Sequence, residues 1–188
     1  MDVSAERQYT LADAYAFPEK DGHRYEIIDG VLFVSAAPRA FHEWSVGQVF
    51  AHLNDWTRVH GGWALPGGNV DLADDTHLEP DVIFLAPGRP LPDELAHTDP
   101  DLVVEVSSPS TRSYDTGIKR ARYARSGVPE SWFVDLDQQR IEVSRLEGDR
   151  WYGDPVILEV DDRLTSPSLP GFAVPVRDLV VLPTGGPT

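Results

Sequence analysis

The run Leu102-Val103-Val104-Glu105-Val106 constrains the fold more than any other part of the sequence. Its apolar, valine-rich composition is typical of a strand that is buried on both faces in the middle of a sheet. A carboxylate without a partner is costly at such a place. We therefore expect Glu105 to be neutralised, paired with a cation or bound to a metal ion.

The composition is that of a soluble globular protein. The chain has 188 residues, of which 41% are hydrophobic and 25% charged, and this length is sufficient for one domain with a substantial core. We expect a single domain over residues 1–182 and a disordered tail over residues 183–188. The N-terminus lacks the apolar core of a signal peptide, and no run approaches the ~20 apolar residues of a membrane helix. The predicted location is the cytoplasm.

The charge balance and the absence of cysteine restrict the possible chemistry. Without cysteine the chain has no disulfide, thiolate metal site or cysteine nucleophile. The net charge of −15 argues against a large surface that binds nucleic acid, although carboxylates can also gather around cations. Residues 112–125 are the exception, because they contain four arginines and one lysine against one acid, Asp115.

Turn signals and periodicity predict a mixture of helices and strands. Asp29-Gly30 predicts a hairpin within residues 23–37, and apolar spacing predicts helices over residues 39–62 and from about residue 110 to residue 126. Two strands are expected between residues 63 and 88, the second over Asp81–Leu85, and a later hairpin around Asp137. This order favours an α/β or α+β fold with a mixed central sheet flanked by helices.

Two acids are attached to separate predicted strands. Alternation along the strand places Glu105 on the face opposite to Val104, and Asp81 opens the apolar run that follows it. If the two strands are neighbours, Asp81 and Glu105 can converge on one cation. Carboxylate and carbonyl oxygens are the ligands that Mg²⁺ and Mn²⁺ prefer.

The helix after the strand carries Asp115, Lys119 and Tyr123 at a spacing of four residues, so they share one face. One interpretation is a surface ion pair between Asp115 and Lys119. Another is that Lys119 points towards Glu105, where its ammonium could orient water or stabilise charge on a phosphate. A buried pair of Glu105 and Lys119 without any metal is a further alternative, and Tyr123 is expected to pack at the edge of the core.

Two segments resemble a known family. The sequence PDVIFL at residues 80–85, followed by DLVVEVSSPSTRSYDTGIKRARYARSGVPESWFVD at residues 101–135, resembles the Uma2 family of restriction-endonuclease-like proteins, within the PD-(D/E)XK nuclease superfamily. RYEIIDGVLFV and SPSLPGFAVPVRDL extend the similarity to about residues 8–182. The resemblance implies a restriction-endonuclease-like fold with an N-terminal β-hairpin.

The resemblance also implies a metal site. It assigns the aspartate of the motif to Asp81 and the acidic position to Glu105, with the carbonyl of Val106 as a third ligand of Mg²⁺ or Mn²⁺. The third motif position falls on Ser107 instead of lysine, and Lys119 on the following helix is the matching candidate.

Glu26 and His42 are further candidates from the same resemblance. They would complete the site from the first hairpin and from the start of the first long helix. The alternative for Glu26 is an ion pair with Arg24 at a strand edge, and for His42 a place on the helix surface.

The activity implied by the resemblance is metal-dependent hydrolysis of phosphodiester bonds in nucleic acid, most simply DNA, by a protein that could form a homodimer. Arg112, Arg120 and Arg122 are predicted to line the rim of the cleft and contact phosphates. The alternative is that these arginines balance neighbouring acids. Two alternative functions remain open. One is a nucleic-acid-binding or regulatory module that keeps the nuclease fold without cleavage, and the other is a glycosidase that uses Asp81 and Glu105.

Overall fold

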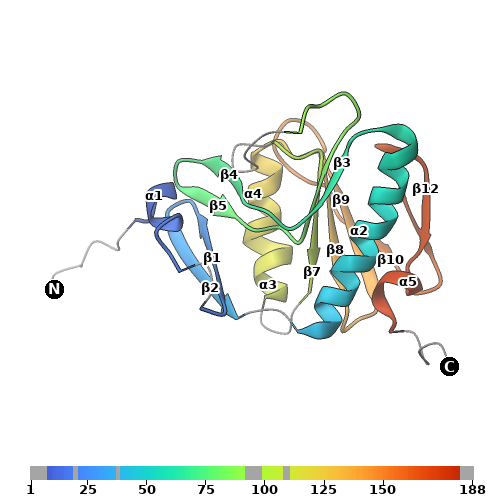
Figure 1. Ribbon diagram of the computed structural model, residues 1–188, viewed down its shortest axis with the longest axis horizontal. Helices are drawn as coiled ribbons and strands as arrows, with labels where there is room; N and C mark the ends of the chain where they lie inside the picture. The colour runs from blue at the N-terminus through green and yellow to red at the C-terminus, as the bar shows by residue number, and fades with distance from the viewer. Residues whose placement is uncertain (1–7, 19–20, 37–38, 92–98, 108–110, 183–188) are drawn as a thin grey trace.

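The computed structural model of the chain describes residues 8–18, 21–36, 39–91, 99–107 and 111–182. Its centre is a six-stranded sheet in the order β10-β9-β8-β7-β6-β3 (Figure 1). The strands are β3 (Trp63–Pro66), β6 (Val82–Leu85), β7 (Leu102–Val106), β8 (Glu130–Asp135), β9 (Arg140–Arg145) and β10 (Val156–Leu158). Only β7 and β8 are parallel neighbours. The predicted mixed central sheet is therefore confirmed.

A second sheet lies beside the first and has the order β2-β1-β5-β4. Its strands are β1 (His23–Ile28), β2 (Val31–Ala36), β4 (Val70–Ala73) and β5 (Thr76–Leu78). The predicted hairpin is formed by β1 and β2, and Asp29 and Gly30 have φ angles of 49° and 79°. Two positive φ values are what a type I′ turn requires, and the Asp-Gly pair supplies them.

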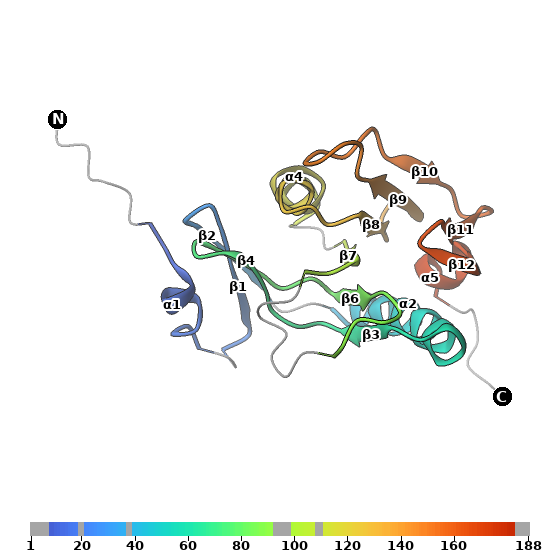
Figure 2. The same ribbon diagram turned by 90° about the horizontal axis from the view of Figure 1, so that it is seen from above.

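Helices cover both faces of the central sheet (Figure 2). On one face lie α2 (Ala40–His60) and the short α5 (Arg177–Val180), together with the hairpin of β11 (Arg163–Ser166) and β12 (Leu169–Pro175). The other face carries a continuous helical segment of α3 (Arg112–Tyr114), the π-turn η2 (Asp115–Lys119) and α4 (Arg120–Arg125). The short α1 (Leu11–Ala14) packs on the second sheet.

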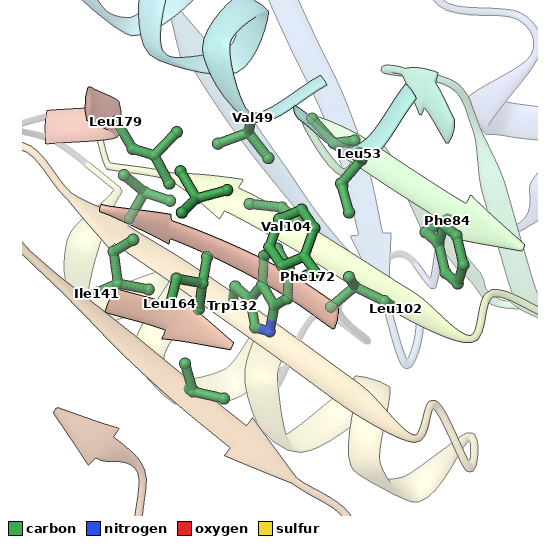
Figure 3. Close-up of a cluster of buried hydrophobic side chains, with 14 of the residues drawn as sticks. Val49, Leu53, Phe84, Leu102, Val104, Trp132, Ile141, Leu164, Phe172 and Leu179 are labelled. Carbon is green, nitrogen blue, oxygen red and sulfur yellow. The ribbon is translucent and has the colours of Figure 1, made fainter. Parts of the chain in front are cut away.

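The main core lies between α2 and the central sheet (Figure 3). Val49 and Leu53 of α2 face Leu102 and Val104 of β7, and the rings of Trp132 and Phe172 stack with centroids 5.7 Å apart. Each such fully buried side chain contributes roughly 1.5–3 kcal/mol. Because one face of β7 belongs to this core, Glu105 on its other face is directed towards the helical segment.

Gly62 fixes the connection between α2 and β3. It has a φ of +87°, and a Cβ at this position would lie 2.5 Å from the carbonyl oxygen of Leu85. Only glycine therefore allows the chain to pass so close to the end of β6.

Three parts of the fold differ from the expectation. Residues 63–88 form four strands instead of two, because β4 and β5 leave the central sheet: they pair with each other, and β5 also pairs with β1. The predicted helix of residues 110–126 contains a π-turn, and its predicted start lies outside the described residues. The hairpin of β11 and β12 was not predicted. The tail of residues 183–188 also lies outside the described part.

Within the described part of the chain, no helix combines the length and the apolar composition that crossing a membrane requires.

Candidate active site

The pairing of β6 with β7 brings Asp81 next to Glu105. Val82 pairs with Val104 in the antiparallel register, so Asp81, which precedes β6, adjoins the end of β7 that carries Glu105. The main-chain N–H of Asp81 donates to the carbonyl oxygen of Val104 at 3.0 Å. In return, the N–H of Val106 donates to Oδ2 of Asp81 at 2.8 Å. The main chain of Val106 therefore lies against the Asp81 carboxylate.

The Asp81 carboxylate is buried between a cation and an imidazole. Arg24 of β1 donates from Nη1 to its Oδ1 at 2.7 Å, and Nε2 of His42 lies 3.1 Å from its Oδ2. Burial opposes the ionisation of Asp81, but the hydrogen bond from His42 and the charge of Arg24 outweigh it and lower the pKa of Asp81 to about 2. Asp81 is thus a carboxylate that keeps its charge although it is 3% exposed.

Glu105 is held by the helical segment on the other face of the sheet. Its Oε1 lies 2.9 Å from Nζ of Lys119 and accepts a hydrogen bond of 2.6 Å from the hydroxyl of Tyr123. Burial raises the pKa of Glu105 well above its usual range against the opposing charge of Lys119, and the neighbouring carboxylates raise it further. Tyr123 is fully buried and touches the site instead of only packing at the edge of the core.

Lys119 joins the second sheet to the first. Its ammonium also lies 2.7 Å from Oε1 of Glu26, which in turn accepts the main-chain N–H of Glu79 at 2.8 Å. Burial alone would lower the pKa of Lys119, but the charges of Glu105 and Glu26 hold it well above its usual range. The side chain reaches this position from the π-turn, in which the N–H of Arg120 donates to the carbonyl of Asp115. Such turns are frequent at functional sites.

These side chains surround one small cavity. The residues predicted from the sequence that line it are Glu26, His42, Asp81, Glu105, Val106 and Lys119. The cavity measures about 30 Å³, which is room for an ion or a few water molecules because a water needs roughly 10–15 Å³ by this measure. A nucleotide does not fit inside it, so a polymer substrate would meet the cavity from outside.

Two residues of the cavity were missed as site residues. The sequence predicts Arg24 only as a partner of Glu26, and Asp115 only as a partner of Lys119 in a surface ion pair. Both nevertheless line the cavity. Burial raises the pKa of Asp115 to about 6. The signals were present in the sequence, because Arg24 and Glu26 alternate onto one face of β1 and Asp115 precedes Lys119 by one helical turn.

The three predicted rim arginines have partners elsewhere. Arg112 pairs with Asp135 and Glu142, and Arg120 donates to the hydroxyl of Ser144 and to the carbonyl of Gly153.

Arg122, the third of them, is buried, and it contacts Asp29 at 3.1 Å and the hydroxyls of Thr76 and Ser126. None of the three lines the cavity. This placement favours the alternative that they balance acidic residues and neighbouring polar groups.

The residues fit a divalent cation by their charge and donor chemistry. Four carboxylates line the cavity against two permanent cations, Arg24 and Lys119, so two negative charges are in surplus if every carboxylate is ionised and His42 is neutral. The four are Glu26, Asp81, Glu105 and Asp115. Oxygen donors of this kind suit Mg²⁺ and Mn²⁺. Among the described residues no three His, Asp or Glu side chains already form a metal-ligand cluster. The ligands that the resemblance implies, Asp81, Glu105 and the Val106 carbonyl, belong to residues that line the cavity.

Comparison with known proteins relates the chain to a family. The model of the Uma2 family, described as "Putative restriction endonuclease", matches residues 11–177. A crystal structure from Anabaena variabilis ATCC 29413, of "a putative nuclease belonging to DUF820", has a TM-score of 0.77 with this chain. It is 19% identical, and the match covers 92% of this chain and 97% of the other. This likeness shows a shared fold. A search of curated proteins gave no match.

Proposed function

The chain belongs to the Uma2 family, and from that premise we propose that it hydrolyses phosphodiester bonds in nucleic acid with a divalent metal ion as cofactor. The observation that carries the proposal is the surplus of buried carboxylates around a cavity that also contains a lysine. A surplus of buried negative charge is unfavourable unless a cation compensates it. We propose DNA as the substrate and Mg²⁺ or Mn²⁺ as the ion.

Asp81, Glu105 and the main-chain carbonyl of Val106 would hold the ion. Asp81 is charged and oriented by His42 and by the N–H of Val106 before any ion binds. When bound, a divalent ion lowers the pKa of water and neutralises charge that develops on phosphate oxygens. The protein contributes the fixed positions of two carboxylates from neighbouring strands.

Lys119 is the residue that we propose to act on the water or the phosphate. Its ammonium is held between Glu105 and Glu26 at the cavity, so its position is fixed before substrate binds. A fixed positive charge in a buried place stabilises developing negative charge without reorganisation. Glu26 is then a positioning residue, since it acts through Lys119.

Arg24 and His42 orient Asp81 from opposite sides. Arg24 is the more accessible, with 29% of its side chain exposed, so its guanidinium can meet a phosphate at the mouth of the cavity. His42 is 5% exposed, and its Nδ1 is buried without a hydrogen-bond partner in the described part of the chain. A proton held at Nε2 keeps the imidazole as a donor to Asp81.

Nucleic-acid binding without cleavage is the second candidate. Ser107 at the third motif position favours it, because the lysine of the motif is displaced to Lys119. The net charge of −15 and the internal partners of Arg112 and Arg120 reduce the positive surface available to phosphates for both candidates. The homodimer predicted from the sequence remains a prediction. Sedimentation velocity of the purified chain measures its molecular mass in solution and so tests this prediction.

The test is a cleavage assay on labelled single- and double-stranded DNA and RNA, with Mg²⁺, Mn²⁺ or EDTA. The proposal expects cleavage of DNA that requires a metal ion and is lost in Glu105→Gln. The matched control is Glu159→Gln, which removes an exposed carboxylate elsewhere and should cleave like the wild type. Binding with no cleavage under any condition would support the second candidate, and cleavage that survives both EDTA and Glu105→Gln would contradict the proposal.

A further inference from the structure

A second pocket lies on the opposite side of the second sheet from the candidate active site. Side chains alternate along β1, so Arg24 and Glu26 line the active-site cavity while His23 and Tyr25 line this pocket. It measures about 320 Å³, and α1 and the segment after it contribute Ala14, Tyr15 and Phe17 to its lining. This volume is within the range of about 300–1,000 Å³ that is usual for small-molecule sites.

The walls of the pocket are aromatic rings in fixed positions. The rings of Phe17 and Tyr25 stack with centroids 4.5 Å apart, and Tyr15 meets His77 edge to face at 5.4 Å. The buried carboxylate of Asp71 accepts a hydrogen bond from the Tyr15 hydroxyl at 2.5 Å and lies 2.6 Å from Nδ1 of His77. These contacts fix the positions of the rings that line the space before any ligand enters.

The charge of the pocket is negative. Glu79 lines it and is half-buried. Among the described residues its carboxylate has no ion pair in direct contact, and the charge of Arg24 attracts it only from farther away. The main-chain N–H of Glu79 donates to Glu26, which fixes the position of the residue. The described lining contains neither lysine nor arginine, and Asp21 lies close by, because it accepts the hydroxyl of Tyr25.

We propose that this pocket binds a small organic cation, one with an alkylammonium or guanidinium group. Aromatic faces attract such cations, and a partly buried carboxylate supplies the opposite charge. A phosphorylated ligand would meet only negative charge, and a bare metal ion would find one carboxylate among rings. The inference does not rest on the proposed nuclease activity, because it uses none of the residues of that site except the main-chain contact between Glu79 and Glu26.

Isothermal titration with agmatine, spermidine and choline tests the proposal on the full chain, and guanosine tests a nucleobase as the alternative ligand. We expect saturable binding of at least one cation to the wild type and no binding of guanosine. Glu79→Gln should weaken the cation at least about tenfold, and Phe17→Leu should weaken it by a smaller factor. Glu159→Gln is the charge-matched control and should bind like the wild type.

Melting temperatures of the four proteins establish that each variant is folded. Failure of all three cations to bind the wild type would overturn the proposal, even if the variants did not fold. It would also be overturned by equal affinity of folded Glu79→Gln and wild type, or by guanosine binding more tightly than every cation.

Discussion

Glu105 and Glu130 are two buried glutamates on neighbouring parallel strands of one sheet, and their surroundings differ. Glu130 of β8 is 2% exposed and Glu105 of β7 is 4% exposed. Oε1 of Glu130 accepts the indole N–H of Trp132 at 2.8 Å and lies 3.3 Å from Arg145, while its Oε2 accepts the hydroxyl of Ser166 at 2.7 Å. Glu130 thus has both oxygens satisfied by two neutral donors and one cation.

Glu105 belongs to a group in which carboxylates outnumber cations. Lys119 is shared between Glu105 and Glu26, and Asp81 and Asp115 line the same cavity. The different surroundings of Glu105 and Glu130 show that a buried carboxylate does not by itself indicate a functional site. A surplus of carboxylates over cations around a cavity does, because the protein alone does not supply enough positive charge for all of them to ionise.

The largest expected effect comes from removing the lysine. Lys119→Met leaves Glu105 and Glu26 buried without their ammonium and should lower the free energy of unfolding by roughly 3–5 kcal/mol. The equivalent change beside Glu130, Arg145→Met, should cost only about 1 kcal/mol, because Arg145 is 38% exposed and two neutral donors remain. Urea unfolding measures both, and equal losses would break the comparison.

The next largest effect is expected in the rate of DNA cleavage, which should fall in a Glu105 variant and stay nearly unchanged in a Glu130 variant. Glu105→Gln removes a proposed metal ligand and should lower the rate of DNA cleavage by more than about 100-fold. Glu130→Gln should keep the rate within about twofold, because Glu130 does not line the cavity. Both rates are measured with saturating Mn²⁺ on the same substrate, and similar losses in the two variants would contradict a special role for Glu105.

Without metal, the free energy of unfolding should fall more in Glu130→Gln than in Glu105→Gln, which is the opposite of the order expected for activity. Glu130→Gln weakens a satisfied network and should lower the free energy of unfolding by about 1–3 kcal/mol. Glu105→Gln should change it by less than about 1 kcal/mol, since burial and nearby carboxylates already disfavour the charge of Glu105. Urea unfolding in EDTA is the measurement, and a greater loss in Glu105→Gln would show that its charge stabilises the fold.

The smallest effect concerns Arg120, one of the three arginines that do not line the cavity. Arg120→Ala removes the hydrogen bond to Ser144 and the contact with the ring of Tyr152, and should cost about 1 kcal/mol of stability. Its affinity for nucleic acid should stay within about twofold of the wild type. Fluorescence-anisotropy titration measures this affinity. A tenfold weaker affinity of Arg120→Ala would show that Arg120 contacts phosphates of the nucleic acid, as the sequence predicts.

Much of the candidate site follows from local sequence patterns. The valine-rich run predicts β7, alternation predicts the face of Glu105, and the PD dipeptide before an apolar run predicts the place of Asp81. The spacing of Asp115, Lys119 and Tyr123 predicts that they point the same way, and the structure brings all three to Glu105 or its cavity. These are consequences of strand and helix periods, which a sequence displays directly.

The remainder depends on contacts between distant segments. Nothing local in Arg24 indicates that it pairs with Asp81, which lies 57 residues away. The same is true of β4 and β5, which join the second sheet through the pairing of β5 with β1. It is also true of the partners that Arg120 and Arg122 contact. The π-turn also leaves no periodic signal, because it shifts the helical register by only one residue.

The most direct measurement of the central claim is calorimetric titration of Mn²⁺ into the wild type, Glu105→Gln and Asp81→Asn, with Glu130→Gln as the control. If the surplus of carboxylates around the cavity is compensated by a metal ion, Mn²⁺ binds to the wild type and to Glu130→Gln, and binding disappears in the other two variants. Absence of binding to the wild type, or binding that persists in Glu105→Gln and in Asp81→Asn, would contradict the account.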